Sequence, residues 1–163
     1  MAVDVGSNLL LRHLIPVQAF TSGFTTSTQI CHEKIKFTFL DDAALGVHKI
    51  RSTTTHPVVV PPEPILVTDI SASSQTPTNV ADGIPNPVSA WEAFYPKGSI
   101  NPSGTIPGGF GFYLSGPQFF SNDLENASEV LFSYRMMLQE GWEWVMGGKL
   151  PGICEPPIPW FSV

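Results

Sequence analysis

Charged residues are scarce in this sequence. Asp, Glu, Lys and Arg make up 13% of the 163 residues, about half of the ~25% that is usual in soluble domains. Basic residues are the scarcer kind: 8 Lys and Arg stand against 14 Asp and Glu, and the formal net charge is -6. A nucleic-acid partner requires a basic face that neutralises phosphates, so this balance argues against one. An anionic ligand would have to be bound by a local group of basic residues.

Long apolar runs and cysteines are also scarce. No apolar stretch reaches the ~18 residues of a membrane-spanning helix, so we expect no membrane partner. The two cysteines, Cys31 and Cys154, cannot form a disulfide framework, and free thiols are the favoured interpretation. The histidines lack the spacing of metal ligands. We therefore expect neither a metal ion nor a cofactor.

The N-terminus contains one short apolar run, Leu9 to Leu11. Arg12 and His13 interrupt this run, and Asp4 precedes it without a basic segment. A secretion signal needs both a basic start and a longer apolar core, so the sequence shows no convincing one. Localisation and oligomeric state are left open.

Proline and glycine, in contrast, are abundant. With 16 Pro, 14 Gly and 42% hydrophobic residues, the composition favours a loop-rich, all-β protein over a helical bundle. The length allows one domain with a core. We expect a poorly ordered segment at 1–19 and one domain over 20–163. Residues 52–87, rich in Ser, Thr and Pro, are expected to form a loop or linker within it.

Alternating hydrophobicity predicts several strands. Residues 35–40 place Ile35, Phe37 and Phe39 on a buried face. Residues 58–60 and 65–67 are expected to form short edge strands beside prolines.

The clearest alternation covers residues 130–138, which we predict to be a strand with one apolar and one mixed face. A helix is the competing interpretation there, because Met, Leu, Gln and Glu favour helices. A single helical turn is expected within residues 122–127.

Few residues suggest chemistry by themselves. Glu140 and Glu143 could form the carboxylate pair of a glycosidase, but their spacing favours solvated turn acids. The glycines of GGFGF, residues 108–112, suit bends and close packing, because no phosphate-binding Lys-Ser/Thr follows them. Lys149 lies between Gly147-Gly148 and a Leu-Pro-Gly turn, where a ligand could approach closely.

Several aromatic residues and one arginine would suit sugar binding, although core packing explains most of the aromatic residues equally well. These residues are Arg135, Trp91, Tyr95, Tyr113, Trp142 and Trp144.

Two stretches resemble a known family. WEAFYPKGSINPSGTIPGGFGFYLSGP and SYRMMLQEGWEWVMGGKLPG resemble the fungal branch of polysaccharide lyase family 14, the alginate and glucuronate lyases. LDDAALGVHKI resembles the N-terminal strand region of these proteins. The resemblance runs from about Phe20 to Ile153, and its most specific element is W-x-x-G-G-K-L-P-G together with the upstream S-Y-R.

The resemblance implies a β-jelly-roll sandwich whose concave sheet binds an acidic polysaccharide and cleaves it by β-elimination. It implies that Lys149 is catalytic and that Arg135, in the S-Y-R strand, is structural or lines the cleft. Tyr134, Trp142 and Trp144 are the expected substrate-binding aromatic residues. A non-catalytic carbohydrate-binding β-sandwich module is the alternative, and a β-sandwich interaction protein is a third.

The last ten residues depart from the family pattern. In the family, G-G-K-L-P-G is normally followed by Tyr-Gly-Gly and about another half of the domain, which carries further active-site groups. Here CEPPIPWFSV follows Ile153. We therefore expect a C-terminally truncated form that lacks most of the active site and could be inactive for that reason, with an unspliced intron as the origin of residues 154–163. A short form that evolved as such is the alternative.

Overall fold

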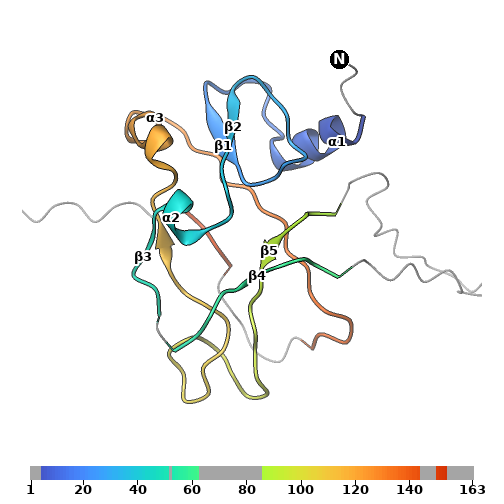
Figure 1. Cartoon of the computed structure of the whole chain (residues 1–163), viewed down its shortest axis with the longest axis vertical. Coiled ribbons are helices and arrows are strands. Elements are labelled where there is room, and N and C mark those ends of the chain that lie inside the picture. Colours follow the sequence, from blue (N-terminus) through green and yellow to red (C-terminus); the bar gives the residue numbers. More distant parts are fainter. Residues whose placement is uncertain (1–4, 52, 63–85, 144–149, 154–163) are drawn as a thin grey trace, which may run out of the picture.

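The computed structural model describes residues 5–51, 53–62, 86–143 and 150–153 (Figure 1). The described strands pair in three two-stranded sheets, β1–β2, β3–β6 and β4–β5. The elements follow in the order α1 (Val5–Leu14), β1 (Gly23–Thr25), β2 (Ile35–Phe37), α2 (Asp42–Leu45), β3 (Val47–His48), β4 (Val58–Val59), β5 (Ala90–Trp91), β6 (Tyr113–Leu114), η1 (Gln118–Phe120) and α3 (Ser121–Glu125).

The predicted fold class is confirmed in its coarser form. Helices are few and short, and several small sheets are joined by long loops. A sandwich or jelly roll is not identified within the described ranges. None of the helices in these ranges is long and apolar enough to cross a membrane.

The main apolar cluster lies at the N-terminal end, where we expected a poorly ordered segment. Helix α1 covers the β1–β2 sheet at the upper end of the molecule in Figure 1. Its Leu10 is only 2% exposed and packs with Ile30 and Ile35, and Leu14 and Phe20 pack against this cluster. Burial of this apolar stripe explains why the segment is helical, since a ten-residue helix is marginal by itself in water.

Strand β2 is shorter than predicted, and its expected buried face is wrong. Ile35 is buried, but Phe37 and Phe39 are 44% and 69% exposed, and Thr38 is buried instead. The partner strand β1 spans only three residues, so the ladder ends near Phe37. The two phenylalanine rings pack edge-to-face on the surface with centroids 5.3 Å apart.

Helix α2 follows from local signals at its two ends. Asp41 caps α2 by accepting a hydrogen bond from the Ala44 backbone N–H at 2.7 Å. Gly46 ends the helix at φ 61, a left-handed conformation that glycine adopts without steric cost. Strand β3 then pairs antiparallel with β6, which joins residues almost seventy positions apart.

The β4–β5 pair carries an aromatic cluster around His56. The predicted edge strand at 58–60 is confirmed as β4, which pairs antiparallel with β5. The Trp91 ring meets the Phe112 ring at 4.9 Å, and the Phe110 and Phe112 rings stack at 5.2 Å. The expected strand at 65–67 lies outside the described residues.

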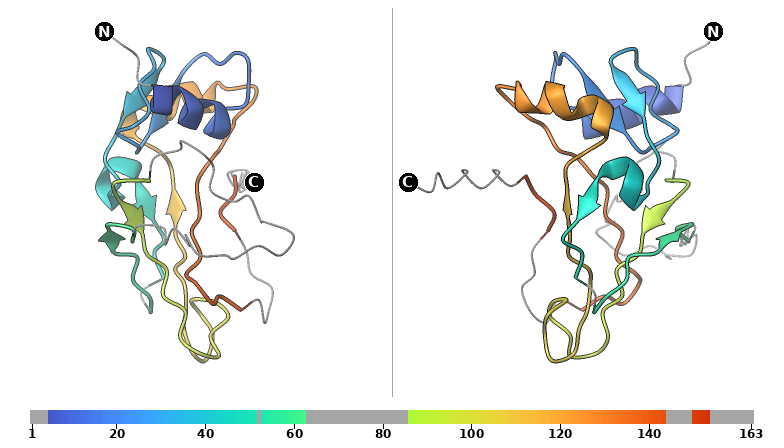
Figure 2. Two further views of the ribbon diagram at one scale, coloured as in Figure 1. Left: turned by 90° about the vertical axis from the view of Figure 1, so that its right-hand side faces the viewer. Right: turned by 60° about the vertical axis from the view of Figure 1, so that its left-hand side comes forward.

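Residues 130–138 form neither the predicted strand nor the competing helix. The segment runs along much of the length of the molecule (orange to red in Figure 2), and it pairs with no strand among those described. Both of its faces are exposed: Phe132 and Met137, from opposite faces, are 42% and 57% exposed. Alternating hydrophobicity therefore indicates only an extended backbone. A β-strand also needs a neighbouring strand with which it exchanges backbone hydrogen bonds. The predicted helical turn nearby is confirmed as α3.

Candidate functional site

The residues predicted for substrate binding lie along the last described part of the chain. Tyr134 and Arg135 belong to the exposed segment 130–138, and the Tyr134 ring packs on that of Phe132 with centroids 5.5 Å apart. Trp142 follows a tight turn in which its backbone N–H donates to the Gln139 carbonyl at 3.2 Å. Trp144 and Lys149 lie outside the described residues.

Trp142 is joined to the glycine-rich stretch through Tyr95. The two rings meet edge-on, with centroids 5.7 Å apart and an interplanar angle of 86°. The Tyr95 ring in turn lies over Gly109, where an added Cβ would be 2.5 Å from the phenolic oxygen. The close-packing interpretation of the GGFGF glycines is thereby confirmed at Gly109. Gly109 thus helps to position Trp142, a predicted sugar-binding residue, through the Tyr95 ring that packs against both.

Glu140 and Glu143 are surface acids in the structure. Both are exposed and flank the turn that Gly141 makes at φ 74. The solvated-turn interpretation is therefore the better one for these two acids.

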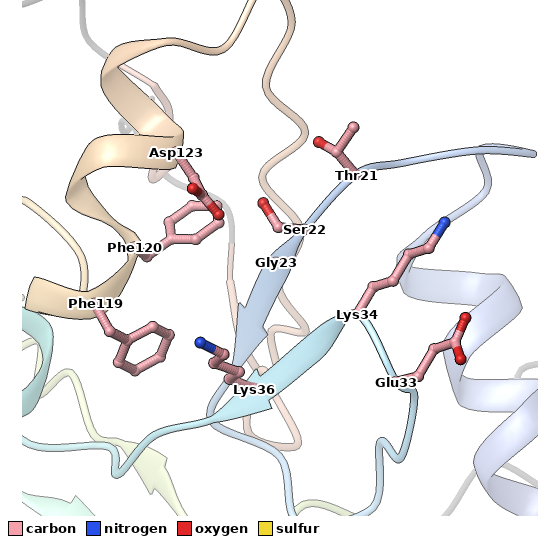
Figure 3. A pocket seen from close by; sticks show the side chains of 9 residues that line it. All are labelled: Thr21, Ser22, Gly23, Glu33, Lys34, Lys36, Phe119, Phe120 and Asp123. Carbon is pink, nitrogen blue, oxygen red and sulfur yellow. The ribbon is translucent and has the colours of Figure 1, made fainter.

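Hollows open on the surface of the described residues, among them the following two. The first lies between the β1–β2 sheet and the η1–α3 turn (Figure 3). Its volume of about 270 Å³ is below the ~300–1,000 Å³ of most small-ligand sites. Its lining residues are Thr21, Ser22, Gly23, Glu33, Lys34, Lys36, Phe119, Phe120 and Asp123.

The charges of this first hollow balance. Lys36 Nζ lies 5.2 Å from the centroid of the Phe119 ring, and Lys34 Nζ donates to the Phe20 carbonyl at 3.2 Å. Glu33 and Asp123 bring two negative charges to the same lining. An anionic ligand would therefore gain little here, because each lysine is offset by a carboxylate.

The second hollow, which we call the basic hollow, is lined by Lys49, Ile50, Arg51 and Tyr113. Its volume is about 440 Å³, and it is an open hollow whose four lining residues are all exposed. Two cations and no carboxylate line it, in a chain whose net charge is -6. The basic hollow is thus a local group of basic residues of the kind that an anionic ligand requires on an acidic protein.

Of the basic hollow's residues, sequence reasoning considered only Tyr113, as one aromatic among several. The available signal was the stretch HKIR, which places two of the 8 basic residues close together. Nothing in the sequence indicated that Tyr113, over sixty residues away, would join them. The β3–β6 pairing brings them together.

His56 and Asp42 form a hydrogen-bonded pair with a different character, in which the Asp42 side chain is 45% exposed. His56 Nε2 donates to Asp42 Oδ1 at 2.9 Å, and the histidine side chain is 11% exposed. The rings of Trp91, Phe110 and Phe112 surround the imidazole, with centroids 4.9 to 5.9 Å away. The pair ties α2 to the aromatic cluster.

Metal-binding groups are not found in the part of the chain that the structure describes. His, Cys, Asp and Glu side chains in these ranges nowhere gather in threes around a common point.

In the comparison with known proteins, one family model matches part of the chain. The family model for polysaccharide lyase 14 matches residues 86–157. No curated protein and no solved structure matches the chain. The match contains both segments on which the resemblance is strongest, whereas the resemblance over residues 20–85 stays a prediction. The part of the chain that carries Tyr134, Arg135, Trp142 and Lys149 is therefore similar to polysaccharide lyase 14.

Proposed function

We propose that this protein acts on a uronic-acid-containing polysaccharide of the alginate or glucuronan type by β-elimination. The observation that carries the proposal is the match of residues 86–157 to polysaccharide lyase 14. The basic hollow supports it independently, because an acidic polymer needs local positive charge on a protein of net charge -6.

The reaction breaks two bonds and forms one double bond. A base removes the proton on C5 of a uronate unit, and the electron pair of the C–H bond becomes the C4–C5 double bond. The bond from C4 to the glycosidic oxygen breaks, and an acid protonates that oxygen. Removal of the C5 proton places negative charge on the carboxylate, so stabilisation of this charge is the largest contribution that the protein can make.

Lys149 is the residue that we assign to this step. Its ammonium group would neutralise the carboxylate, or its amine would take the C5 proton. Glycine has no side chain, so the two glycines before it in the sequence would let the polymer approach the backbone. Arg135, Tyr134, Trp142 and Trp144 are assigned to binding the sugar chain, by charge and by contact with the sugar faces.

The proposal includes the jelly-roll fold that the family resemblance implies. Two of the described sheets, β3–β6 and β4–β5, are antiparallel pairs of strands far apart in the sequence. Such non-local antiparallel pairing is typical of β-sandwiches. An experimental structure of the protein with bound oligouronate would test this part directly.

The activity is tested by incubating the protein with polymannuronate, polyguluronate and polyglucuronate and recording the ultraviolet absorbance of the new double bond. We expect one of the polymers to yield unsaturated products. Lys149→Ala should lower the rate by about 10²–10⁴-fold, the usual contribution of a positioned acid or base. Lys149→Arg separates the two roles, because it keeps the charge but cannot act as a base at neutral pH.

Lys97 is the matched control. It is an exposed lysine that belongs to neither hollow, so Lys97→Ala changes the net charge equally and should leave the rate unchanged. If no polymer yields unsaturated products, or if Lys149→Ala reacts as fast as the wild type, the proposed activity is wrong.

A non-catalytic carbohydrate-binding module is the second candidate, and the basic hollow favours it. Sedimentation of the protein with alginate or glucuronan, without any new absorbance, would select this function. Under it, Lys149→Ala would change only the affinity for the polymer.

A further inference from the structure

We propose that the basic hollow formed by Lys49, Arg51 and Tyr113 is a binding site for a carboxylate group of the polysaccharide. This inference deepens the proposed function and rests on it for the identity of the ligand. The site itself is argued from the geometry of the β3–β6 pair and the charges around it.

The β3–β6 register brings the three residues together. His48 pairs with Tyr113 across the two strands, and its imidazole stacks on the phenol ring with centroids 6.0 Å apart. Lys49 comes next in the chain, and its Nζ lies 5.1 Å from the centroid of the same ring. The Arg51 backbone N–H donates to the Gly111 carbonyl at 2.9 Å. Both cationic residues are thus held against the strand that carries Tyr113.

Lys49 has an unusual backbone conformation. Its φ of 53 lies in the left-handed region, and among the described residues other than glycine no other φ is positive. This region is sterically unfavourable for lysine but not for glycine. Strained conformations of this kind concentrate at binding sites. Here the left-handed conformation of Lys49 turns the chain between β3 and Arg51. The Lys49 side chain contacts the Tyr113 ring.

The electrostatic environment favours an anion. No carboxylate lines the hollow, and neither Lys49 nor Arg51 forms an ion pair within the described ranges, where His56–Asp42 is the pair that is found. The tyrosine side chain is accessible, with 52% of Tyr113 exposed. The first hollow has two lysines as well, but it also has Glu33 and Asp123. The basic hollow is therefore the better anion site of the two.

The chemistry of the two cations indicates which anion fits. The planar guanidinium of Arg51 matches the two oxygens of a carboxylate, and the ammonium of Lys49 adds a compact second charge. The ring of Tyr113 supports the lysine by a cation–π contact and offers a hydroxyl at the rim. A uronate unit presents a planar carboxylate beside hydroxyl groups, and it would satisfy all three side chains.

Binding of oligoglucuronate and oligomannuronate to the full chain tests this site, with a neutral glucan oligomer as the ligand control. We would measure the dissociation constants by titration calorimetry at low ionic strength, because screening weakens exposed charge contacts. The two variants are Lys49→Asn and Arg51→Gln. Asparagine tolerates the left-handed region, so the first variant removes the charge without adding strain. Lys97→Asn removes one positive charge outside both hollows.

We expect Lys49→Asn and Arg51→Gln each to raise the dissociation constant of the acidic oligomer by about tenfold or more, as removal of a charged hydrogen-bond donor does. Lys97→Asn should leave it within about twofold, and the melting temperatures of all three variants should match the wild type. Circular dichroism would verify that each variant is folded.

Elimination is recorded in the same samples, so the two proposals can fail separately. If the acidic oligomer binds and the hollow variants lose affinity, the carboxylate site is supported even when unsaturated products are absent. If all variants bind alike, if Lys97→Asn loses as much affinity as the other two, or if the acidic oligomer does not bind, the site is overturned. If unsaturated products form but the hollow variants bind the oligomer like the wild type, the lyase activity is supported and the carboxylate site is refuted.

Discussion

Gly109→Ala should destabilise the protein because the added methyl group would clash with the Tyr95 ring. Gly109 has φ 71, and a Cβ there would lie 2.5 Å from the Tyr95 phenolic oxygen and 2.6 Å from Cζ. The left-handed backbone costs a non-glycine residue about 1–2 kcal/mol. Overpacking against the ring adds about 1–3 kcal/mol, and the stiffer unfolded chain returns about 0.4–1 kcal/mol. We therefore expect a loss of about 1–5 kcal/mol in the free energy of unfolding.

Gly141→Ala is the matched control. Gly141 has φ 74, nearly the same backbone conformation, but a Cβ there would meet no atom within 4 Å. It carries the backbone strain without the clash, so its cost should be only about 0–1.5 kcal/mol. Urea denaturation followed by tryptophan fluorescence measures both variants. The difference between them isolates the contribution of the Tyr95 ring.

Removing the ring completes the comparison. In a Tyr95→Ala background, Gly109→Ala should cost no more than Gly141→Ala does, because the overpacking is gone. The Tyr95 ring also packs edge-on against Trp142, so Gly109→Ala should shift the native fluorescence spectrum as well. If Gly109→Ala and Gly141→Ala cost the same, or if the cost persists without Tyr95, the close packing that we describe is wrong.

Two further changes test the packing of the described residues by urea denaturation. Leu10→Ala should cost about 2–5 kcal/mol, because Leu10 is 2% exposed in the N-terminal cluster; Val17→Ala, at an exposed position, should cost less than about 0.5 kcal/mol, and equal losses would contradict the cluster. Asp42→Ala should cost about 1–3 kcal/mol by leaving the His56 Nε2–H without its acceptor. Asp42→Asn keeps an acceptor oxygen and should cost less, and the reverse order would refute the hydrogen bond.

Local signals were sufficient where a few neighbouring residues decide the structure. The aspartate and glycine around α2 place its two ends, and the valines beside proline form β4 as an edge strand. The family similarity was also visible in the sequence, since it depends on the order of residues in GGFGFYLSGP and SYRMMLQEGWEW. Residues 86–157, which the family model matches, contain both.

Local signals failed where a distant partner decides. Residues 130–138 alternate like a strand, yet they lie exposed without a pairing neighbour among the described residues. Phe37 and Phe39 have the spacing of a buried face, but β1 is too short to extend the sheet past them. In both cases the backbone preference is local, whereas hydrogen bonding and burial require a second segment.

The sequence by itself determined the loop-rich, low-helix character of this protein, its acidic charge and its similarity to a polysaccharide lyase family. These properties depend on composition and on residue order alone. Only the tertiary structure decided that Lys49 and Arg51 would meet Tyr113, and that Gly109 would hold the ring beside Trp142. The physical reason is that strand pairing and side-chain contact act between residues far apart in the chain, and no local pattern records which distant residues will meet.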